Sequence, residues 1–360
     1  MKVLGIETSC DECAAAVVED GRKILSNVVA TQIPFHAEYN GVVPEIASRK
    51  HTEWIYRVVQ EALDKASLKA DEVDAAAATA HPGLLGSLLV GLNFAKAFAW
   101  ARDIPFIAVD HMLAHLYAPR LEYAVPDNPE KSGASTDATS GKKVDYPFLG
   151  LLVSGGHTII CRADSFDDIT VLGATIDDAV GEAFDKVSKH YGFGYPGGAV
   201  IDKLAGNGNA AAFNFPMPNL HKGEHRYDVS YSGLKTAVIN QLEQFRAGRK
   251  EDPLNDNPAD IAASFQKTAV EILLRSLYRA AEDTGLTTIV AGGGVAANSY
   301  LRAALARRQD LLSIFPPLEL CGDNGAMIAG IACQYLARGE KSPLTVTASA
   351  RVRSFKRQYP

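Results

Sequence analysis

Two histidines four residues apart are the feature of this sequence with the clearest chemical potential. In Asp110-His111-Met112-Leu113-Ala114-His115, positions i and i+4 share one face of a helix, so both imidazoles could reach a single metal ion. Far downstream, Asp323 offers a carboxylate just before an apolar segment. Two histidines and one aspartate form a three-ligand set with open positions, which is typical of a metal that takes part in chemistry. Taken alone, an HxxxH pair is more commonly two histidines packed in a core helix.

Glycine-rich turns are a second group of residues with ligand-binding potential. Ser154-Gly155-Gly156-His157 and Gly292-Gly293-Gly294 each follow an apolar run, and Tyr195-Pro196-Gly197-Gly198 lies between them. Glycine backbones let N–H groups approach an anion closely, and a helix start adds the positive end of its dipole. Each turn alone is consistent with a tight β-turn, but together they favour a nucleotide or phosphoanhydride site. The sequence contains no GxxxxGK[ST] motif, which disfavours a P-loop NTPase.

Alternating strand and helix patterns position these residues. The patterns predict strands near residues 3–8, 14–18, 24–30, 73–79 and 106–110, with helices near 47–66 and 84–101. The second half then repeats the opening, with strands near 148–153, into Cys161, and near 287–291. It adds helices near 177–191, 233–245 and 261–281. Such a duplication predicts two α/β lobes facing a cleft, where ligands gather at strand ends and glycine-rich turns.

Composition sets broader limits. The chain has 360 residues, 47% of them hydrophobic, and a net charge of −6, which excludes a generally basic nucleic-acid coat. Its five cysteines form no regular framework, which favours a reducing compartment. Glu7 comes too early for a signal-peptide core, and no stretch of about 18 apolar residues predicts a membrane span. We therefore expect a cytoplasmic protein without a membrane segment.

We expect the first lobe to cover residues 1–108 and 325–349, and the second lobe, with the metal and nucleotide motifs, to cover 109–324. Residues 123–143 are rich in Pro, Ser, Thr, Gly, Asp and Lys and predict a flexible insertion. Residues 350–360 form a basic tail.

Ten ordered motifs, spread over nearly the whole chain, resemble those of the bacterial-type TsaD family, the catalytic subunits of tRNA N6-adenosine threonylcarbamoyltransferase. They are IETSCDE from Ile6, GVVPEIASR from Gly41, HPGLLGSLLVG from His81, DHMLAHLYA from Asp110, LLVSGGHT from Leu151, DDAVGEAFDKV from Asp177, YPGG from Tyr195, YSGLKTAV from Tyr231, GGGVAAN from Gly292 and DNGAMIA from Asp323. Small departures occur at Cys13-Ala14, Asn40 and Gly322.

The resemblance implies a two-lobed fold of the actin, heat-shock-70 and sugar-kinase type (ASKHA), with the ligand cleft between the lobes. It also implies an acyltransferase reaction, in which the threonylcarbamoyl group passes from threonylcarbamoyl-AMP to N6 of adenosine 37 in tRNAs that read ANN codons. The products are t6A and AMP.

The resemblance also implies roles for individual residues. His111, His115 and Asp323 would hold one divalent metal per subunit, Fe²⁺ or Zn²⁺. The adenylate would be bound by Leu152, Val153, Ser154, Gly155, Gly156, Asp185, Gly198 and Asn298. The alternatives are a solvated carboxylate for Asp185 and an ordinary helix N-cap for Asn298.

Charge considerations suggest how the transfer would run. Attack by an amine on a carbamoyl carbon builds negative charge on the carbonyl oxygen and on the departing phosphate, which a metal with open positions can stabilise. No Ser/His/Asp or Cys/His constellation is evident, consistent with direct transfer to the amine. Asp11 and Glu12 are candidate catalytic residues that orient the acyl group or accept the amine proton, or else are solvated turn residues.

Three other functions are disfavoured by particular residues. A zincin metalloprotease needs Glu after its first histidine, where this chain has Met112. A small-molecule kinase would use the glycine turns but not His111 and His115. A non-catalytic scaffold would be expected to lose the two histidines, and both are present.

Partners follow from the resemblance and from the distribution of charge. The family implies a paralogous same-fold subunit (TsaB-like), a small P-loop ATPase (TsaE-like) and a separate enzyme that supplies threonylcarbamoyl-AMP. For tRNA, an acidic protein must concentrate basic residues locally. The candidate clusters are Arg351, Arg353, Lys356 and Arg357 in the tail, and Arg302, Arg307 and Arg308. A solvated, mobile tail is the alternative.

Overall fold

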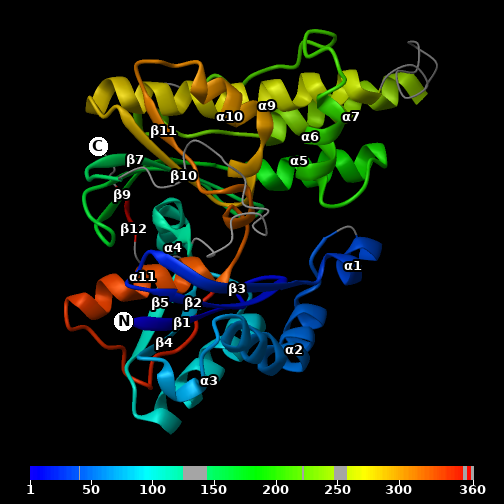
Figure 1. Ribbon diagram of the computed structural model, residues 1–360. Helices are drawn as coiled ribbons and strands as arrows, with labels where there is room; N and C mark the ends of the chain where they lie inside the picture. Colours follow the sequence, from blue (N-terminus) through cyan, green and yellow to red (C-terminus); the bar gives the residue numbers. More distant parts are fainter. Residues whose placement is uncertain (40, 125–143, 221–222, 247–257, 352–354, 358–360) are drawn as a thin grey trace. The chain divides into compact units, whose positions relative to one another are not determined.

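The computed structural model describes residues 1–39, 41–124, 144–220, 223–246, 258–351 and 355–357. These residues form two compact units (Figure 1). Unit 1 comprises Met1–Asp145, Ser165–Asp168 and Ile314–Phe355, and unit 2 comprises Tyr146–Asp164, Ile169–Ser313 and Lys356–Pro360. Most of the insertion expected at residues 123–143 lies outside the described residues.

Unit 1 is built on a six-stranded sheet in the order β5-β4-β1-β2-β3-β6. Its strands are β1 (Lys2–Glu7), β2 (Glu12–Glu19), β3 (Lys23–Thr31), β4 (Ala75–His81), β5 (Phe106–Asp110) and β6 (Glu122–Tyr123). The first three form an antiparallel meander, whereas β4 runs parallel to β1 and β5 runs parallel to β4. The carboxyl ends of β1, β4 and β5 therefore meet at one edge of the sheet.

Helices cover both faces of this sheet, which explains why β1 is buried along nearly its whole length. On one face, Leu4 and Ile6 join an apolar cluster with α2 (Pro44–Lys65) and α3 (Leu85–Arg102). Gly5 points to the opposite face, where α11 (Gly325–Ala337) lies against the strand. Figure 1 shows α2 and α3 on one side of the sheet, and α11 with α4 (His111–Tyr117) on the other. The short helix α1 (Ile33–His36) precedes α2.

Unit 2 repeats this plan with strand order β11-β10-β7-β8-β9-β12. The strands are β7 (Phe148–Val153), β8 (Thr158–Ala163), β9 (Ile169–Ala174), β10 (Thr288–Gly292), β11 (Leu312–Ile314) and β12 (Phe355–Arg357). The helices are α5 (Val180–Tyr191), α6 (Gly197–Ala205), α7 (Ser232–Arg246), α9 (Pro258–Thr284) and α10 (Ser299–Ala306). An antiparallel meander is again followed by a strand, β10, that runs parallel to the first strand of the meander.

The internal duplication predicted from the sequence is therefore confirmed, as is the mixed α/β architecture. The elements that the sequence patterns did not predict include the short α1, β6, β11 and β12, together with β9 and α6. α6 begins with two glycines, which are poor helix formers. Among the described helices, none has the length and apolar character needed to cross a membrane.

The expected lobe boundaries need one correction. We expected residues 109–124, 144–145, 165–168 and 314–324 in the second lobe, but they belong to unit 1. The physical reason is that α4 follows β5 without a linker and packs against α11, which itself lies on β1 and β2. The tail is also divided, because Arg351 falls in unit 1 whereas β12 joins the sheet of unit 2. Residues 352–354 and 358–360, including Arg353, lie outside the described residues.

Candidate metal centre and adenylate-binding turns

The two histidines are held by a short helix whose start is fixed by its neighbour. Asp110 ends β5 and caps α4, because its Oδ1 accepts hydrogen bonds from the N–H groups of Met112 and Leu113 at 2.7 and 3.2 Å. The next residue is His111, and His115 follows one turn later on the same face. Both imidazoles are buried, with 7% and 1% of their surface exposed. The predicted i,i+4 arrangement is therefore present.

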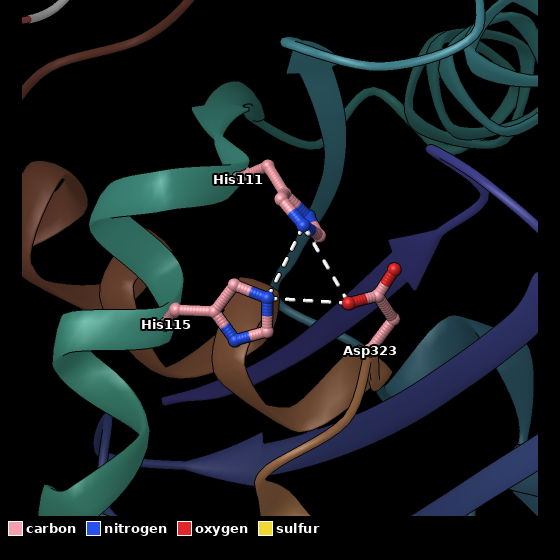
Figure 2. A group of neighbouring side chains, drawn as sticks. All are labelled: His111, His115 and Asp323. Carbon is pink, nitrogen blue, oxygen red and sulfur yellow. Dashed lines mark hydrogen bonds and ion pairs between the residues drawn. The ribbon is translucent and has the colours of Figure 1, made fainter. Parts of the chain in front are cut away.

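Asp323 reaches the same point from the turn before α11. Asn324 caps that helix by accepting a hydrogen bond from the N–H of Met327, which leaves the preceding carboxylate projecting toward the histidines (Figure 2). Asp323 Oδ1 lies 3.2 Å from His115 Nε2 and 3.5 Å from His111 Nε2, and the two Nε2 atoms are 3.2 Å apart. The three ligand atoms thus lie within 4.8 Å of one another. Two imidazole nitrogens and a carboxylate oxygen converging this closely suit a divalent transition metal.

The pKa values of the two imidazoles are shifted in opposite directions by their surroundings. Burial alone would lower the pKa of His111, but the carboxylates of Asp323 and Glu7 outweigh it and raise the pKa to about 9. Burial and the neighbouring charge of His111 lower the pKa of His115. Coordination through both Nε2 atoms requires that neither carries a proton, so metal binding at this pair competes with protons.

Asp11 and Glu12 belong to the same unit as the metal group. Their turn is held through its backbone, since the carbonyl oxygens of Cys10 and Asp11 accept hydrogen bonds from His51 Nε2 at 2.9 Å and the Gln32 N–H at 3.1 Å. Burial, followed by the charges of Asp11 and Asp323, raises the pKa of Glu12 well above its usual range. Asp11 is 8% exposed, so neither residue is an ordinary solvated turn carboxylate.

Cys10, in the same turn, does not suit nucleophilic catalysis. Burial, together with the charges of Asp11 and Asp323, raises the pKa of its thiol well above the usual range. A protonated thiol is a weak nucleophile, which agrees with direct transfer to an amine.

In unit 2, the first glycine turn is a hairpin between β7 and β8. The N–H of Ser154 donates to the carbonyl of His157, and the His157 N–H donates back to Ser154 Oγ at 3.1 Å. Gly155 and Gly156 are exposed, and a Cβ on either would meet no atom within 4 Å. Leu152 and Val153 are buried in β7, so they have backbone atoms but not side chains to offer a ligand.

Two further glycines pack against this hairpin. A Cβ at Gly181, in the first turn of α5, would lie 2.5 Å from the Ser154 carbonyl oxygen. Gly293, with φ of +92°, leaves no room for a side chain because the Val153 carbonyl lies against it. The turn after β7, the start of α5 and the turn after β10 therefore meet within unit 2.

The other predicted adenylate residues are linked through α6. Asp185 Oδ1 accepts a hydrogen bond from the Gly197 N–H at 2.7 Å, while Gly198 beside it has open space where a Cβ would be. Asn298 caps α10 by accepting from the Leu301 N–H, and its amide donates to Asp202 of α6 at 3.2 Å. The capping alternative for Asn298 is therefore confirmed, and Asp185 is tied to the backbone of α6.

Glu7 was missed as a candidate site residue. Its carboxylate lies 2.9 Å from His111 Nδ1 and is completely buried. The available signal was an acidic residue directly after the apolar run at residues 3–6 of one strand. Burying a carboxylate is costly unless it is hydrogen-bonded or paired, so such a residue calls for an explanation.

Comparison with known proteins relates this site to a family. The family model described as "TsaD: tRNA N6-adenosine threonylcarbamoyltransferase" matches residues 23–330. The chain belongs to this family. A protein of that name from Treponema denticola is 63% identical over 358 residues, covering 99% of each chain. One from Treponema pallidum (strain Nichols) is 52% identical and covers 99% of this chain and 95% of its own. One from Borreliella burgdorferi (strain B31) is 50% identical over 360 residues, which is 100% of this chain and 96% of the relative. The chain is thus a transferase of the tRNA-modifying class.

Solved structures support the fold. Full-length HypF in its phosphate- and nucleotide-bound form has a TM-score of 0.58 at 14% identity, over 93% of this chain and 46% of HypF. Component A of the (R)-2-hydroxyglutaryl-CoA dehydratase of Acidaminococcus fermentans has a TM-score of 0.52 at 13% identity, over 94% of this chain and 99% of that one. At such identities the likeness shows a shared fold alone, and it agrees with the predicted ASKHA type.

Proposed function

We propose that this chain transfers the threonylcarbamoyl group from threonylcarbamoyl-AMP to N6 of adenosine 37 in tRNAs reading ANN codons. The observation that carries the proposal is the family match over residues 23–330, combined with an intact group of His111, His115 and Asp323 at one point of unit 1. Because the substrate is tRNA, we propose that the reaction takes place in the cytoplasm.

In the proposed reaction, the N6 amine attacks the carbamoyl carbon, a C–N bond forms, and the C–O bond to the phosphate breaks. AMP leaves with the electron pair, and the amine loses one proton. We propose Glu12 and Asp11 as the acceptors of that proton, since burial and the charges of Asp11 and Asp323 act on Glu12 in the unit that holds the metal group. Orienting the acyl group is the second role that their position allows.

The metal we assign to His111, His115 and Asp323 is Fe²⁺ or Zn²⁺, since both accept two imidazoles and a carboxylate and retain open positions. When bound, it supplies a Lewis acid that stabilises negative charge on the carbonyl or phosphate oxygen. The protein's part is to hold the three donor atoms together, which α4 and the cap of α11 do.

For the adenylate, we propose that residues 152–156 form the phosphate-binding turn, with the backbone N–H groups of Gly155 and Gly156 facing the phosphate. Gly155 and Gly156 are exposed and free of side chains, so an anion can approach them closely. Asp185, whose Oδ1 accepts from the Gly197 N–H at the start of α6, is assigned to the nucleoside as an acceptor of hydrogen bonds from ribose hydroxyls. Asn298 caps α10 and donates to Asp202, so its proposed part is to hold α10 beside α6 at this site. Gly198 leaves room beside Asp185.

Asp185→Asn should weaken AMP binding by about tenfold to a hundredfold, because it removes a charged acceptor of ribose hydrogen bonds. Asparagine retains Oδ1, so the bond from the Gly197 N–H can persist. Calorimetric titration with AMP measures the effect. The control is Asp164→Asn, an exposed carboxylate of unit 2 paired with Arg162. Equal AMP affinity for Asp185→Asn and wild type would remove Asp185 from the site, and metal content should be unchanged throughout.

A transfer assay tests the reaction itself. The purified chain, supplied with its partners, threonylcarbamoyl-AMP and a tRNA transcript, should form t6A as read by nucleoside mass spectrometry. A transcript with guanosine at position 37 is the matched control, since it lacks the N6 amine and should remain unmodified. Modification of both transcripts, or of neither, would contradict the proposal.

We further propose that turnover needs a same-fold subunit (TsaB-like) and a small P-loop ATPase (TsaE-like). Exposed apolar side chains on α2 and α3 support a helical docking face: Tyr56 is 67% exposed and Trp100 75%. Gly86 and Gly91 do not contribute to it, because they pack against Ser48 and Thr8 of the same unit. Omitting each partner from the transfer assay tests the dependence, and full turnover by the chain alone would refute it.

A further inference from the structure

Glu7 stands at the end of β1 with its side chain on the face that carries α4 and α11. Alternation along the strand places it with Gly5, which abuts α11, whereas Leu4 and Ile6 face the α2–α3 cluster. The next residue, Thr8, again turns toward α3, where its hydroxyl donates to the Ser87 carbonyl at 2.9 Å. β1 therefore places the carboxylate of Glu7, which is 0% exposed, next to His111 of the metal group.

Both oxygens of this carboxylate accept hydrogen bonds from neighbouring groups. Oε1 accepts the N–H of Ser9 at 2.5 Å. Oε2 accepts the hydroxyl of Thr79 at 2.6 Å and faces His111 Nδ1 at 2.9 Å. Thr79 lies on the neighbouring strand β4, so two strands of the sheet fix the carboxylate in place. Because a carboxylate only accepts hydrogen bonds, His111 must carry its hydrogen on Nδ1.

That tautomer is the one a metal at Nε2 requires. His111 Nε2 points to His115 Nε2 and Asp323 Oδ1, and a nitrogen that binds a metal has no hydrogen. The second histidine lacks such support, since His115 Nδ1 is buried with no hydrogen-bond partner among the described residues. The two histidines of the pair are therefore held differently.

We propose that Glu7 is the positioning residue of the metal centre, orienting His111, fixing its Nδ1–H tautomer and adding negative charge behind the ligand. This role rests on the proposed metal ligands. It adds to them a residue of β1 that does not itself bind the metal. Outer carboxylates of this kind raise the basicity of a ligating imidazole, and their loss typically weakens metal binding about tenfold to a hundredfold. With Asp323, Glu7 brings the charge of the group to −2, which balances a divalent cation.

The test is Co²⁺ binding to the metal-free full-length protein, measured by competition with a chelator and by the absorption spectrum of bound Co²⁺. Glu7→Gln keeps the shape of the side chain but loses its charge, and should weaken binding at least about tenfold and change the spectrum. Asp228→Asn is the matched control, because Asp228 is 2% exposed and likewise pairs with a histidine, His225 at 2.8 Å, but belongs to unit 2, which contains none of the three proposed ligands. Its Co²⁺ affinity should stay within about threefold of wild type, which separates the effect of the His111 hydrogen bond from loss of buried charge in general.

Thr79→Val covers the case in which Glu7→Gln does not fold. It removes only the hydroxyl that holds Oε2 and should weaken Co²⁺ binding about threefold to tenfold. Wild-type affinity and spectrum in Glu7→Gln or, where that variant does not fold, in Thr79→Val would overturn the role of Glu7, as would an equal loss in Asp228→Asn. If the wild-type chain itself bound no Co²⁺, the proposed ligand set of His111, His115 and Asp323 would be wrong, and the role of Glu7 would fall with it. This result differs from a failure of Glu7 alone, in which wild type and Glu7→Gln bind Co²⁺ equally well.

Discussion

Replacing His111 and His115 together with alanine should abolish stoichiometric metal binding and slow threonylcarbamoyl transfer at least about a hundredfold, because the Lewis acid contributes several kcal/mol to the transition state. Asp323 alone would remain, and one carboxylate with 19% of its side chain exposed does not retain a transition metal against water. Elemental analysis of the purified variant and the transfer assay measure the two effects.

The fold should survive this change, which makes the result interpretable. Alanine is the best helix former, and the cap of α4 by Asp110 is untouched. His190→Ala, in α5 of unit 2, is a control that should keep both metal and activity. Stoichiometric metal in the double variant would show that the ion is held elsewhere, and full activity without metal would show that the metal is dispensable.

The second large effect concerns the glycine that lets α11 lie on the sheet. In Gly5→Ala, the new Cβ would fall on the Gly325 carbonyl oxygen and the Ala329 amide nitrogen, well inside 3.0 Å. Both are backbone atoms, so the helix itself must move. We expect the free energy of unfolding to fall by about 3 kcal/mol or more. Thermal and denaturant unfolding of the purified variants measure it.

Metal binding should weaken in the same variant, because Asp323 immediately precedes α11 and Glu7 ends the strand that carries Gly5. Gly322→Ala is the matched control in the same unit, since its Cβ would meet no atom within 4 Å. It should unfold as wild type does, within about 0.5 kcal/mol. Equal stability of Gly5→Ala and Gly322→Ala would mean that the close approach of α11 to β1 is not needed for the fold.

Local patterns were enough to predict much of this architecture. Strands such as β1 and β7 stand out as short apolar runs before glycine or serine turns, and the repeat between them reveals the duplication. The histidine pair was accessible for the same reason, since i,i+4 spacing acts within one helix. Asn298 likewise follows a local rule for helix capping, and that rule holds.

Features that depend on contacts between segments far apart in the sequence could not be predicted from local patterns. Asp323 lies 208 residues from His115, and their meeting requires α11 to pack beside α4. The same packing moved residues 109–124 into unit 1, against the expected boundary. The role of Glu7 could not be predicted locally, because its partners Thr79 and His111 are 72 and 104 residues away in the sequence.

The most direct test of the central claim is nucleoside mass spectrometry of tRNA from cells in which this gene is repressed. We predict that t6A disappears from tRNAs reading ANN codons as the protein is depleted. A plasmid copy of the wild-type chain should restore it, and the His111→Ala, His115→Ala copy should not. Unchanged t6A after the protein has fallen below detection would contradict the assignment of this chain as the transferase, and restoration by the double variant would contradict the metal centre as its active site.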